Sequence, residues 1–439
     1  MKHPIATFVT ILLASCGGEP ALEAAPPWDV VVVMLDTTRA DHLGPFQLRD
    51  QGPTPFLSRL AKDAIVFQNA WTAATVTAPS TASVLTGLVP PRHGLEYNLM
   101  AQHGAVPEGQ TMRDYLTSVD MVALPRGAQT LAELLSAAGY QTLGIGANPN
   151  FCDEFGFDRG FDVFSESDTR DAEAMAKELE TCLRGMDPNA PTFTYLHFMD
   201  PHSPYRRHTE YCSHPPDERC TRHCRYRSEI AYLDAWLERI FSAQGYADNC
   251  LVVVVTDHGE EFHDHGDILH RNSVHQELAR CGLMIRVPGQ GGRRTRIPAH
   301  HTDVVPTILD ALDLPRPQGL DGISLLEALQ DSDGGQTNIR PLLTVRASGK
   351  GELRALTAGT WRLIADSSGS PSRLYDLEAD PTEQHDLAAQ EPERLRSLEE
   401  ELANLRESLI PLDFEHVSVD MTQAMNEKLQ ALGYGGGDD

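Results

Sequence analysis

The chain has 439 residues, of which 41% are hydrophobic, and a formal charge of −27 at pH 7. This length allows one large α/β domain and a smaller unit, because single hydrophobic cores stop growing at roughly 250–300 residues. The strongly negative charge argues against a nucleic-acid partner and against electrostatic docking on anionic lipid.

Residues 1–15 predict an export signal, which we exclude from the fold. Lys2 precedes an apolar stretch at residues 5–14, which is too short to span a bilayer as a helix. The sequence Leu-Ala-Ser-Cys that ends at Cys16 resembles the lipobox of bacterial lipoproteins. Cleavage before Cys16 would leave its thiol to carry several acyl chains, and residues 16–28 would form a tether. We expect an exported lipoprotein, anchored in the membrane on the periplasmic or outer face; the alternative is an ordinary secretory signal.

Two apolar runs end abruptly in carboxylate and imidazole side chains. Val30–Leu35 is followed by Asp36, and Leu251–Thr256 is followed by Asp257 and His258. Runs without alternation are typical of strands buried on both faces, and open α/β sheets bind ligands beyond the carboxyl ends of such strands. Two carboxylates and one imidazole predict a site for one divalent metal ion, which could be Ca²⁺, Mg²⁺, Mn²⁺ or Zn²⁺. The alternative is that both aspartates only cap strand ends.

Strand and helix signals alternate along the chain between and beyond these runs, which predicts a mainly parallel sheet flanked by helices. The predicted helices are Thr54–Asp63, Pro79–Gly87, Gln129–Ala138, Ala172–Gly185 and Ser228–Ser242, and the further strands are Gln141–Gly146 and Phe193–Phe198. Shorter strand signals at residues 341–372 predict a small antiparallel sheet, and Glu391–Ser408 predicts an amphipathic helix. We therefore expect a large domain at residues 29–330 and a C-terminal subdomain with a tail at residues 331–439.

Thr77 lies just before the predicted start of a helix, because Pro79 favours the first helical turn. A helix N-terminus stabilises anions and a developing alkoxide. Beside a divalent cation, this hydroxyl is a candidate nucleophile. The alternative is that Thr77 is only a cap or turn residue.

The predicted strand Phe193–Phe198 leads into a turn that is bounded by prolines and carries His202. This imidazole is a candidate to donate to a substrate oxyanion or to protonate a leaving group. His197 lies within the strand itself, and we interpret it as a packed, hydrogen-bonded core residue.

Seven cysteines remain besides Cys16, so that at least one of them has no partner among the others. Cys212, Cys220 and Cys224 are close in sequence, and we favour disulfides there over a small zinc loop. Cys281 lies in an apolar run and is a candidate buried, inert thiol.

Four segments carry a family resemblance: DTTRADHLG, TAPSTASVLTG, HFMDPHSPY and TDHGEEFHDHG, in this order. They resemble the sulfatase family of the alkaline phosphatase superfamily, and the likeness extends over residues 29–387. The resemblance implies a large α/β domain with a metal site at the strand ends and a C-terminal subdomain with a small antiparallel sheet. The residues that match family positions are Asp36, Asp257 and His258 as metal ligands, Thr77 as nucleophile, His202 as the histidine that faces the substrate, and His270 about where many members have a lysine.

The chain departs from the family at several of these positions. Sulfatases oxidise a Cys or Ser to formylglycine, but Thr77 stands there, and the arginine of the motif is replaced by Thr81. Thr37 takes the place of a second metal-binding aspartate. The two lysines that grip the sulfate group have no counterparts, since lysine is absent between Lys62 and Lys177 and between Lys177 and Lys350.

We therefore expect a sulfatase-like, metal-dependent hydrolase of sulfate or phosphate (di)esters, in which Thr77 attacks directly. Its substrate would be a small or polymeric anionic ester. A sulfo-threonine lacks the elimination route of formylglycine, which favours phosphorus over sulfur. One alternative is a catalytically inactive, sulfatase-like protein that binds anionic polymers at the cell surface. Another is a phospho-group transferase that acts on envelope lipids.

Overall fold

The computed structural model describes residues 28–47, 52–98, 120–166, 171–212, 221–246, 249–327, 329, 340–348, 351–413 and 416–418. The predicted export signal, Cys16 and most of its tether lie outside the described residues, as do Cys220 and the C-terminal tail. No helix among the described residues has the length and apolarity needed to cross a membrane.

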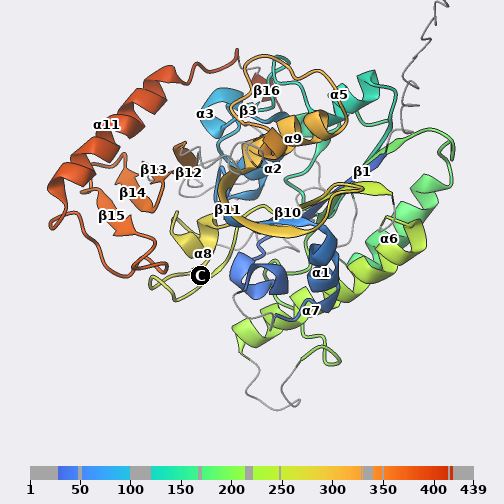
Figure 1. Ribbon diagram of the computed structural model, residues 1–439, viewed down its shortest axis with the longest axis horizontal. Helices are drawn as coiled ribbons and strands as arrows, with labels where there is room; N and C mark the ends of the chain where they lie inside the picture. The colour runs from blue at the N-terminus through green and yellow to red at the C-terminus, as the bar shows by residue number, and fades with distance from the viewer. Residues whose placement is uncertain are drawn as a thin grey trace, which may run out of the picture.

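An eight-stranded sheet forms the centre of the molecule, with the strand order β11-β2-β10-β7-β1-β6-β4-β5 (Figure 1). Only β10 runs antiparallel to its neighbours; the other pairs are parallel. The strands are β1 Asp29–Leu35, β2 Ile65–Trp71, β4 Gln141–Gly146, β5 Val163–Glu166, β6 Thr192–Phe198, β7 Cys250–Thr256, β10 Leu283–Arg286 and β11 Arg293–His300. The predicted mainly parallel α/β sheet is confirmed.

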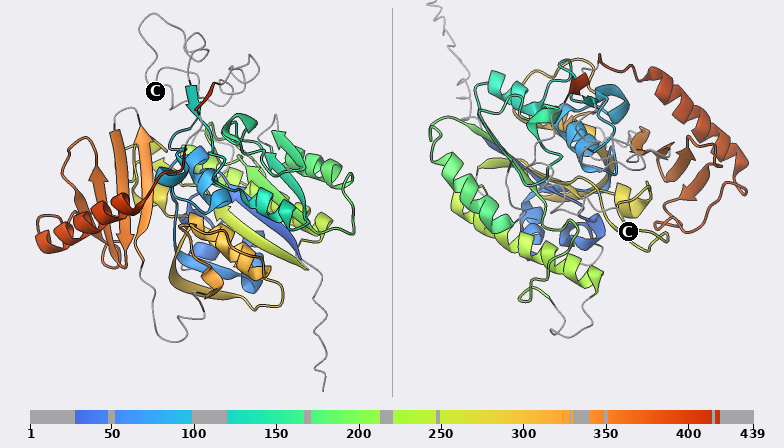
Figure 2. Two further views of the ribbon diagram at one scale, coloured as in Figure 1. Left: turned by 90° about the horizontal axis from the view of Figure 1, so that it is seen from above. Right: turned by 180° about the vertical axis from the view of Figure 1, so that it is seen from behind.

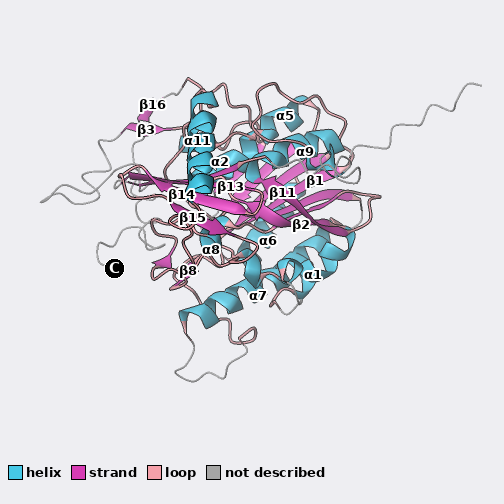
Figure 3. Cartoon of the chain, turned by 60° about the vertical axis from the view of Figure 1, so that its left-hand side comes forward, coloured by secondary structure: helices cyan, strands magenta, loops and turns pink. Residues whose placement is uncertain are grey.

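Helices cover both faces of this sheet, which is why β1 is apolar without alternation (Figure 3). Val30, Val32 and Met34 belong to the core on one face, and Val31 and Val33 belong to the core on the other. The helices against the first face are α2 Thr77–Thr86, α5 Leu131–Ala137 and α9 Val304–Ala311. Those against the second face are α1 Pro55–Leu60, α6 Ala172–Leu183 and α7 Arg222–Gln244.

A separate four-stranded antiparallel sheet lies beside the main sheet, as predicted (Figure 2). Its strands are β12 Leu342–Ser348, β13 Gly351–Ala358, β14 Trp361–Asp366 and β15 Arg373–Asp376, and α11 Pro392–Ser408 covers it. Leu398 and Leu402 of α11 pack into the core of this subdomain. The other short elements are α3 Pro90–His93, β3 Asp120–Val122, β8 Glu261–Phe262, β9 Ile268–Leu269, α8 Gln276–Ala279 and β16 His416–Ser418, with 3-10 turns Ala40–His42, Gly44–Phe46, Ala61–Asp63, Asp153–Phe155 and His301–Asp303.

The structure also places three of the cysteines considered above. Cys281 is buried, and burial raises the pKa of its thiol, which fits an inert core residue. The Sγ atoms of Cys212 and Cys224 lie 3.1 Å apart. The preference for disulfides in this loop stays a prediction.

Candidate functional site

The central strands β7, β1 and β6 bring three ligand-type side chains to one edge of the sheet. Asp36 directly follows β1, Asp257 directly follows β7, and His197 is the last but one residue of β6. Because these strands are adjacent and parallel, their carboxyl ends meet. One ligand atom from each of the three residues lies within 4.8 Å of the other two.

Asp36 uses only one of its two carboxylate oxygens in hydrogen bonds. Its Oδ2 accepts bonds from Asn148 Nδ2 and from His197 Nε2, the latter at 3.1 Å. Its Oδ1 is buried and has no hydrogen-bond partner. His197 thus contacts the site directly, and our interpretation of it as a core residue was incomplete. Its position near the end of the predicted strand Phe193–Phe198 was the signal in the sequence.

Asp257 likewise uses only one of its two carboxylate oxygens in hydrogen bonds. Its Oδ1 accepts hydrogen bonds from the backbone N–H groups of Thr37 and His258, at 2.8 and 2.6 Å. Its Oδ2 is buried without a hydrogen-bond partner. Thr37 holds a backbone φ of 45°, which aims its N–H at the carboxylate. Each of the two aspartates therefore presents one buried oxygen that no protein donor satisfies.

The two carboxylates differ in their pKa values. Burial, together with the charge of Asp36, raises the pKa of Asp257 well above its usual range. Burial also opposes ionisation of Asp36, but the hydrogen bond from His197 and the positive charge of His202 outweigh it and lower its pKa. Without a cation, the two adjacent buried carboxylates therefore oppose each other's ionisation.

His258 is fully buried, and its ring is held in one orientation beside these carboxylates. Its Nδ1 lies 2.9 Å from the carbonyl oxygen of Gly259 and must donate to it, so that Nε2 carries the lone pair of the neutral ring. That Nε2 lies 3.4 Å from Asp257 Oδ2. Two acceptors that face each other in a buried site repel unless a proton or a cation lies between them. The set of Asp36, Asp257 and His258, with His197 beside it, fits a divalent cation.

Thr77 is the first residue of α2 and is completely buried. Its hydroxyl oxygen lies 3.5 Å from His258 Nε2, next to the carboxylate pair. The N–H of Ala78, the second residue of the helix, donates to Asn98 Oδ1 at 2.8 Å, so this donor of the first turn is already used within the protein. Thr81 is also buried, and it lies beside the hydroxyl of Tyr195.

Two more imidazoles lie next to His258. The ring of His270 is 4.8 Å from the ring of His258 and 5.1 Å from that of His202, measured between centroids. His202 donates from Nδ1 to the carbonyl oxygen of Ser203 at 2.6 Å. His270 Nδ1 lies 3.1 Å from Glu260 Oε1. All six predicted site residues thus lie in one connected group.

Glu260 belongs to this group and was not singled out from the sequence. Its side chain is completely buried, and its Oε2 accepts a 2.8 Å hydrogen bond from the Tyr205 hydroxyl. Burial raises its pKa to about 7. The carboxylate fixes the orientation of His270, and the sequence held no pattern that linked the two residues.

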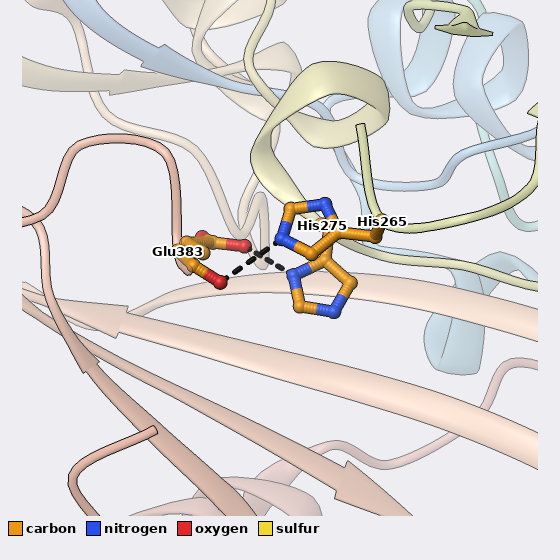
Figure 4. A group of neighbouring side chains, drawn as sticks. All are labelled: His265, His275 and Glu383. Carbon is orange, nitrogen blue, oxygen red and sulfur yellow. Dashed lines mark hydrogen bonds and ion pairs between the residues drawn. The ribbon is translucent and has the colours of Figure 1, made fainter. Parts of the chain in front are cut away.

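A second group with ligand-type atoms, His265, His275 and Glu383, lies between the large domain and the C-terminal sheet (Figure 4). Its ring nitrogens already face protein partners. The Nδ1 atom of His265 lies 2.7 Å from Glu277 Oε1, and its Nε2 atom lies 2.9 Å from the carbonyl oxygen of Glu383. The Nδ1 atom of His275 lies 2.7 Å from Glu383 Oε2, and its Nε2 atom lies 2.9 Å from a terminal nitrogen of Arg373. The group is an ion-pair network and not a cation site.

Comparison with known proteins identifies the family. The sequence model of the family described as Sulfatase matches residues 29–314. The chain belongs to the sulfatase family. It is 26% identical to arylsulfatase K of Bos taurus over 257 residues, which cover 54% of this chain and 46% of that protein. It is 24% identical over 402 residues to the multifunctional alkaline phosphatase superfamily protein PehA of Trinickia caryophylli, covering 69% and 77% of the two chains.

The fold is also similar to that of solved structures. The phosphonate monoester hydrolase of Agrobacterium radiobacter matches with a TM-score of 0.67 at 18% identity, covering 87% of this chain and 96% of that chain. The chain spans about half the length of the arylsulfatase K proteins that it matches. The predicted family and fold are confirmed.

Proposed function

We propose that this sulfatase-family protein is a metal-dependent hydrolase of sulfate or phosphate (di)esters in which Thr77 is the nucleophile. One observation carries the proposal: the buried Thr77 hydroxyl lies 3.5 Å from His258 Nε2, at the point where Asp36 and Asp257 each present an oxygen without a donor. The names of its relatives, an arylsulfatase and a multifunctional alkaline phosphatase superfamily protein, support ester hydrolysis.

The site residues fit one divalent cation, held by Asp36, Asp257 and His258. When bound, this cation would neutralise the two carboxylates and lower the pKa of the Thr77 hydroxyl. His197 keeps Asp36 oriented through its hydrogen bond to Oδ2. The N–H groups of Thr37 and His258 do the same for Asp257.

The reaction then takes two steps. Thr77 loses its proton to water before attack, and its oxygen forms a bond to phosphorus or sulfur while the bond to the leaving oxygen breaks. His202 gives a proton to that leaving oxygen. A water molecule next attacks the phosphorus or sulfur and returns a proton to His202. The bond to the Thr77 oxygen breaks, and this oxygen takes back from water the proton that it lost in the first step. The net reaction is ester plus water to alcohol plus acid.

The chemistry of the adduct favours phosphorus over sulfur. A phospho-threonine can be split by in-line attack of water, whereas a sulfo-threonine lacks the elimination route open to formylglycine. We therefore expect phosphate diesters and related phosphorus esters to be better substrates than sulfate monoesters.

A panel of nitrophenyl sulfate, phosphate, phosphodiester and phosphonate tests the proposal. Each should be assayed with protein reloaded with Ca²⁺, Mg²⁺, Mn²⁺ or Zn²⁺. Thr77→Ala should lower kcat by at least roughly 10³-fold, a loss of about 4 kcal/mol in transition-state stabilisation, and should keep its metal. Mass spectrometry of protein quenched during turnover should find the adduct on Thr77.

Thr86→Ala is the matched control, because Thr86 is a buried threonine at the other end of the same helix. It should retain activity. Wild-type rates in Thr77→Ala would instead mean that water attacks directly, and would exclude Thr77 as nucleophile.

We propose further that the protein is exported and anchored through acylated Cys16. This rests on the lipobox-like sequence alone. Cys16→Ser should move the protein from the membrane fraction to the soluble fraction, or block its processing. Unchanged membrane partition with a mature N-terminus elsewhere would rule out this anchor.

A further inference from the structure

Strand β12 of the C-terminal subdomain runs beside the segment that leads into Thr77. The side chain of Thr344 donates to the carbonyl oxygen of Thr72 at 2.7 Å. The N–H of Val345 donates to Ala73 at 2.9 Å, and Thr75 N–H donates back to Val345 at 3.3 Å. These bonds fix the position of the next residue, Arg346, relative to the start of α2.

Arg346 lies close to the proposed nucleophile. One of its terminal nitrogens donates to the carbonyl oxygen of Thr75 at 3.1 Å, two residues before Thr77. Its positive charge contributes to lowering the pKa of both His258 and His270, after the effect of burial. The guanidinium is therefore close enough to both rings for its charge to act on them.

The site needs a permanent cation that the family's lysines do not supply here. No lysine occurs between Lys62 and Lys177 or between Lys177 and Lys350. Arg39 is near Asp36 in sequence, but its side chain forms ion pairs with Asp41 and Asp264, each at 2.8 Å. It is held in a structural role by these two carboxylates.

His258 and His270 do not fill this need either. His258 donates from Nδ1 to a carbonyl oxygen, and His270 faces a carboxylate through Nδ1. In the neutral rings, Nε2 therefore carries a lone pair. On His258 this lone pair would hold the cation, and on His270 it repels an anionic oxygen instead of binding it. A positive charge from another element of the fold could bind the anionic oxygen instead.

We propose that Arg346, on β12 of the C-terminal subdomain, binds an anionic oxygen of the ester group that Thr77 attacks. The inference rests on the proposed function, because it assigns the anion-binding residue of that same site. A guanidinium stays charged at every working pH and offers several planar N–H donors, so one can hold Thr75 while others hold a phosphoryl or sulfuryl oxygen. The C-terminal sheet would thus be part of the substrate site.

We would measure the binding of inorganic phosphate and of sulfate by calorimetry in a Thr77→Ala protein loaded with metal. Because this variant is expected to lack turnover, the measurement reports binding alone. Arg346→Gln should weaken binding roughly 10- to 100-fold, because it removes a charged hydrogen bond. Arg346→Lys should weaken it several-fold, since the charge stays but the planar donor pair is lost. Arg394→Gln is the matched control: it removes the same charge from the exposed face of α11, and its affinity should not change.

A purely structural role, in which Arg346 only clamps the segment before Thr77, predicts lower thermal stability with unchanged anion affinity. That result in a folded Arg346→Gln protein would overturn the inference. If Arg346→Gln does not fold, Arg346→Lys decides, and an affinity equal to that of Arg346 would overturn it. If neither phosphate nor sulfate binds measurably, the inference is also overturned. Arg346-dependent binding in a protein that hydrolyses none of the panel would leave the inference standing while the proposed function fails.

Discussion

At the scale of single residues, the carboxylates of Asp36 and Asp257 are two buried acids that lie side by side. Both are completely buried, and each has an oxygen that no protein group satisfies. Burying such groups costs several kcal/mol in the absence of a partner. A bound cation would therefore offset this cost, and its binding should raise the free energy of unfolding.

We expect metal to stabilise the wild type but not Asp257→Asn. At a metal concentration about 100 times Kd, the gain should be about 2.7 kcal/mol, measurable by urea unfolding with and without chelator. Without metal, Asp257→Asn should be at least as stable as the wild type, because it removes a buried acid whose pKa is raised by burial and by Asp36. Asp303→Asn is the control: Asp303 is equally buried, but it pairs with Arg340 and contacts none of the predicted metal ligands, and this variant should keep the metal response. A metal response in Asp257→Asn equal to that of the wild type would rule out Asp257 as a ligand.

The sequence alone located the residues that follow strands or belong to motifs. Asp36, Asp257 and His258 could be predicted because apolar runs point to where strands end. Glu260 and Arg346 could not be predicted, because their roles depend on contacts between segments far apart in the chain. Glu260 accepts a hydrogen bond from the hydroxyl of Tyr205, and Arg346 reaches Thr75 from another subdomain. No local pattern encodes such contacts.

At the scale of elements, the turn after β7 determines the position of His258. Gly259 follows this residue, and its N–H donates to the Leu278 carbonyl oxygen at 2.8 Å. A Cβ on Gly259 would lie 1.9 Å from the carbonyl oxygen of Glu277. Backbone atoms on both sides leave no room for a side chain, so that even a methyl group must displace the turn or α8.

Gly259→Ala should therefore lower both stability and activity. The loss in the free energy of unfolding should reach at least about 1–3 kcal/mol, the usual cost of overpacking, measured by chemical denaturation. Gly291→Ala is the matched control, because a Cβ there meets nothing within 4 Å and its backbone is not left-handed. It should change stability by less than about 0.5 kcal/mol. A Gly259→Ala protein with wild-type stability and rate would show that the turn adapts freely.

Most elements could be predicted from their apolar spacing, but some could not. Strand β4 has the predicted bounds, and α2 begins two residues before the predicted Pro79. Helix α7 begins at Arg222 and not at Ser228, because the Thr221 hydroxyl caps it by accepting from Cys224 N–H. Strand β10 runs against its neighbours, and this direction depends on pairing with β2 and β7, which no local spacing specifies.

At the scale of the whole molecule, the large domain and the C-terminal subdomain are joined by buried charges. Arg362 of β14 is completely buried; it pairs with Glu383 at 2.9 Å and lies 4.2 Å over the ring of Trp71 from β2. His265 and His275 stack on each other at 3.7 Å within the same network. If Arg346 acts on substrate, this junction must stay closed for the site to be complete.

The His265 imidazole makes this junction sensitive to pH. Burial opposes its protonation, but the hydrogen bonds to Glu277 and to the Glu383 carbonyl oxygen outweigh burial and raise its pKa to about 9. The unfolded value is about 6.5. A group whose pKa is raised on folding contributes its full stability below the unfolded value and loses it as the pH rises through the folded value. The stability that His265 provides should therefore be complete below about pH 6.5 and be lost as the pH rises through about 9.

Urea unfolding of the wild type and of His265→Gln across pH 6 to pH 10 tests this. The difference in the free energy of unfolding between the two proteins should be largest near pH 6 and should shrink as the pH approaches 10, because only the wild type releases this proton. Other titrating groups cancel in the difference. His385→Gln, which changes a histidine with 81% of its side chain exposed, should give a difference that does not vary in this way. A constant difference between wild type and His265→Gln would mean that His265 is not charged in the folded protein, and that the junction is held by Arg362 and Glu383 without it.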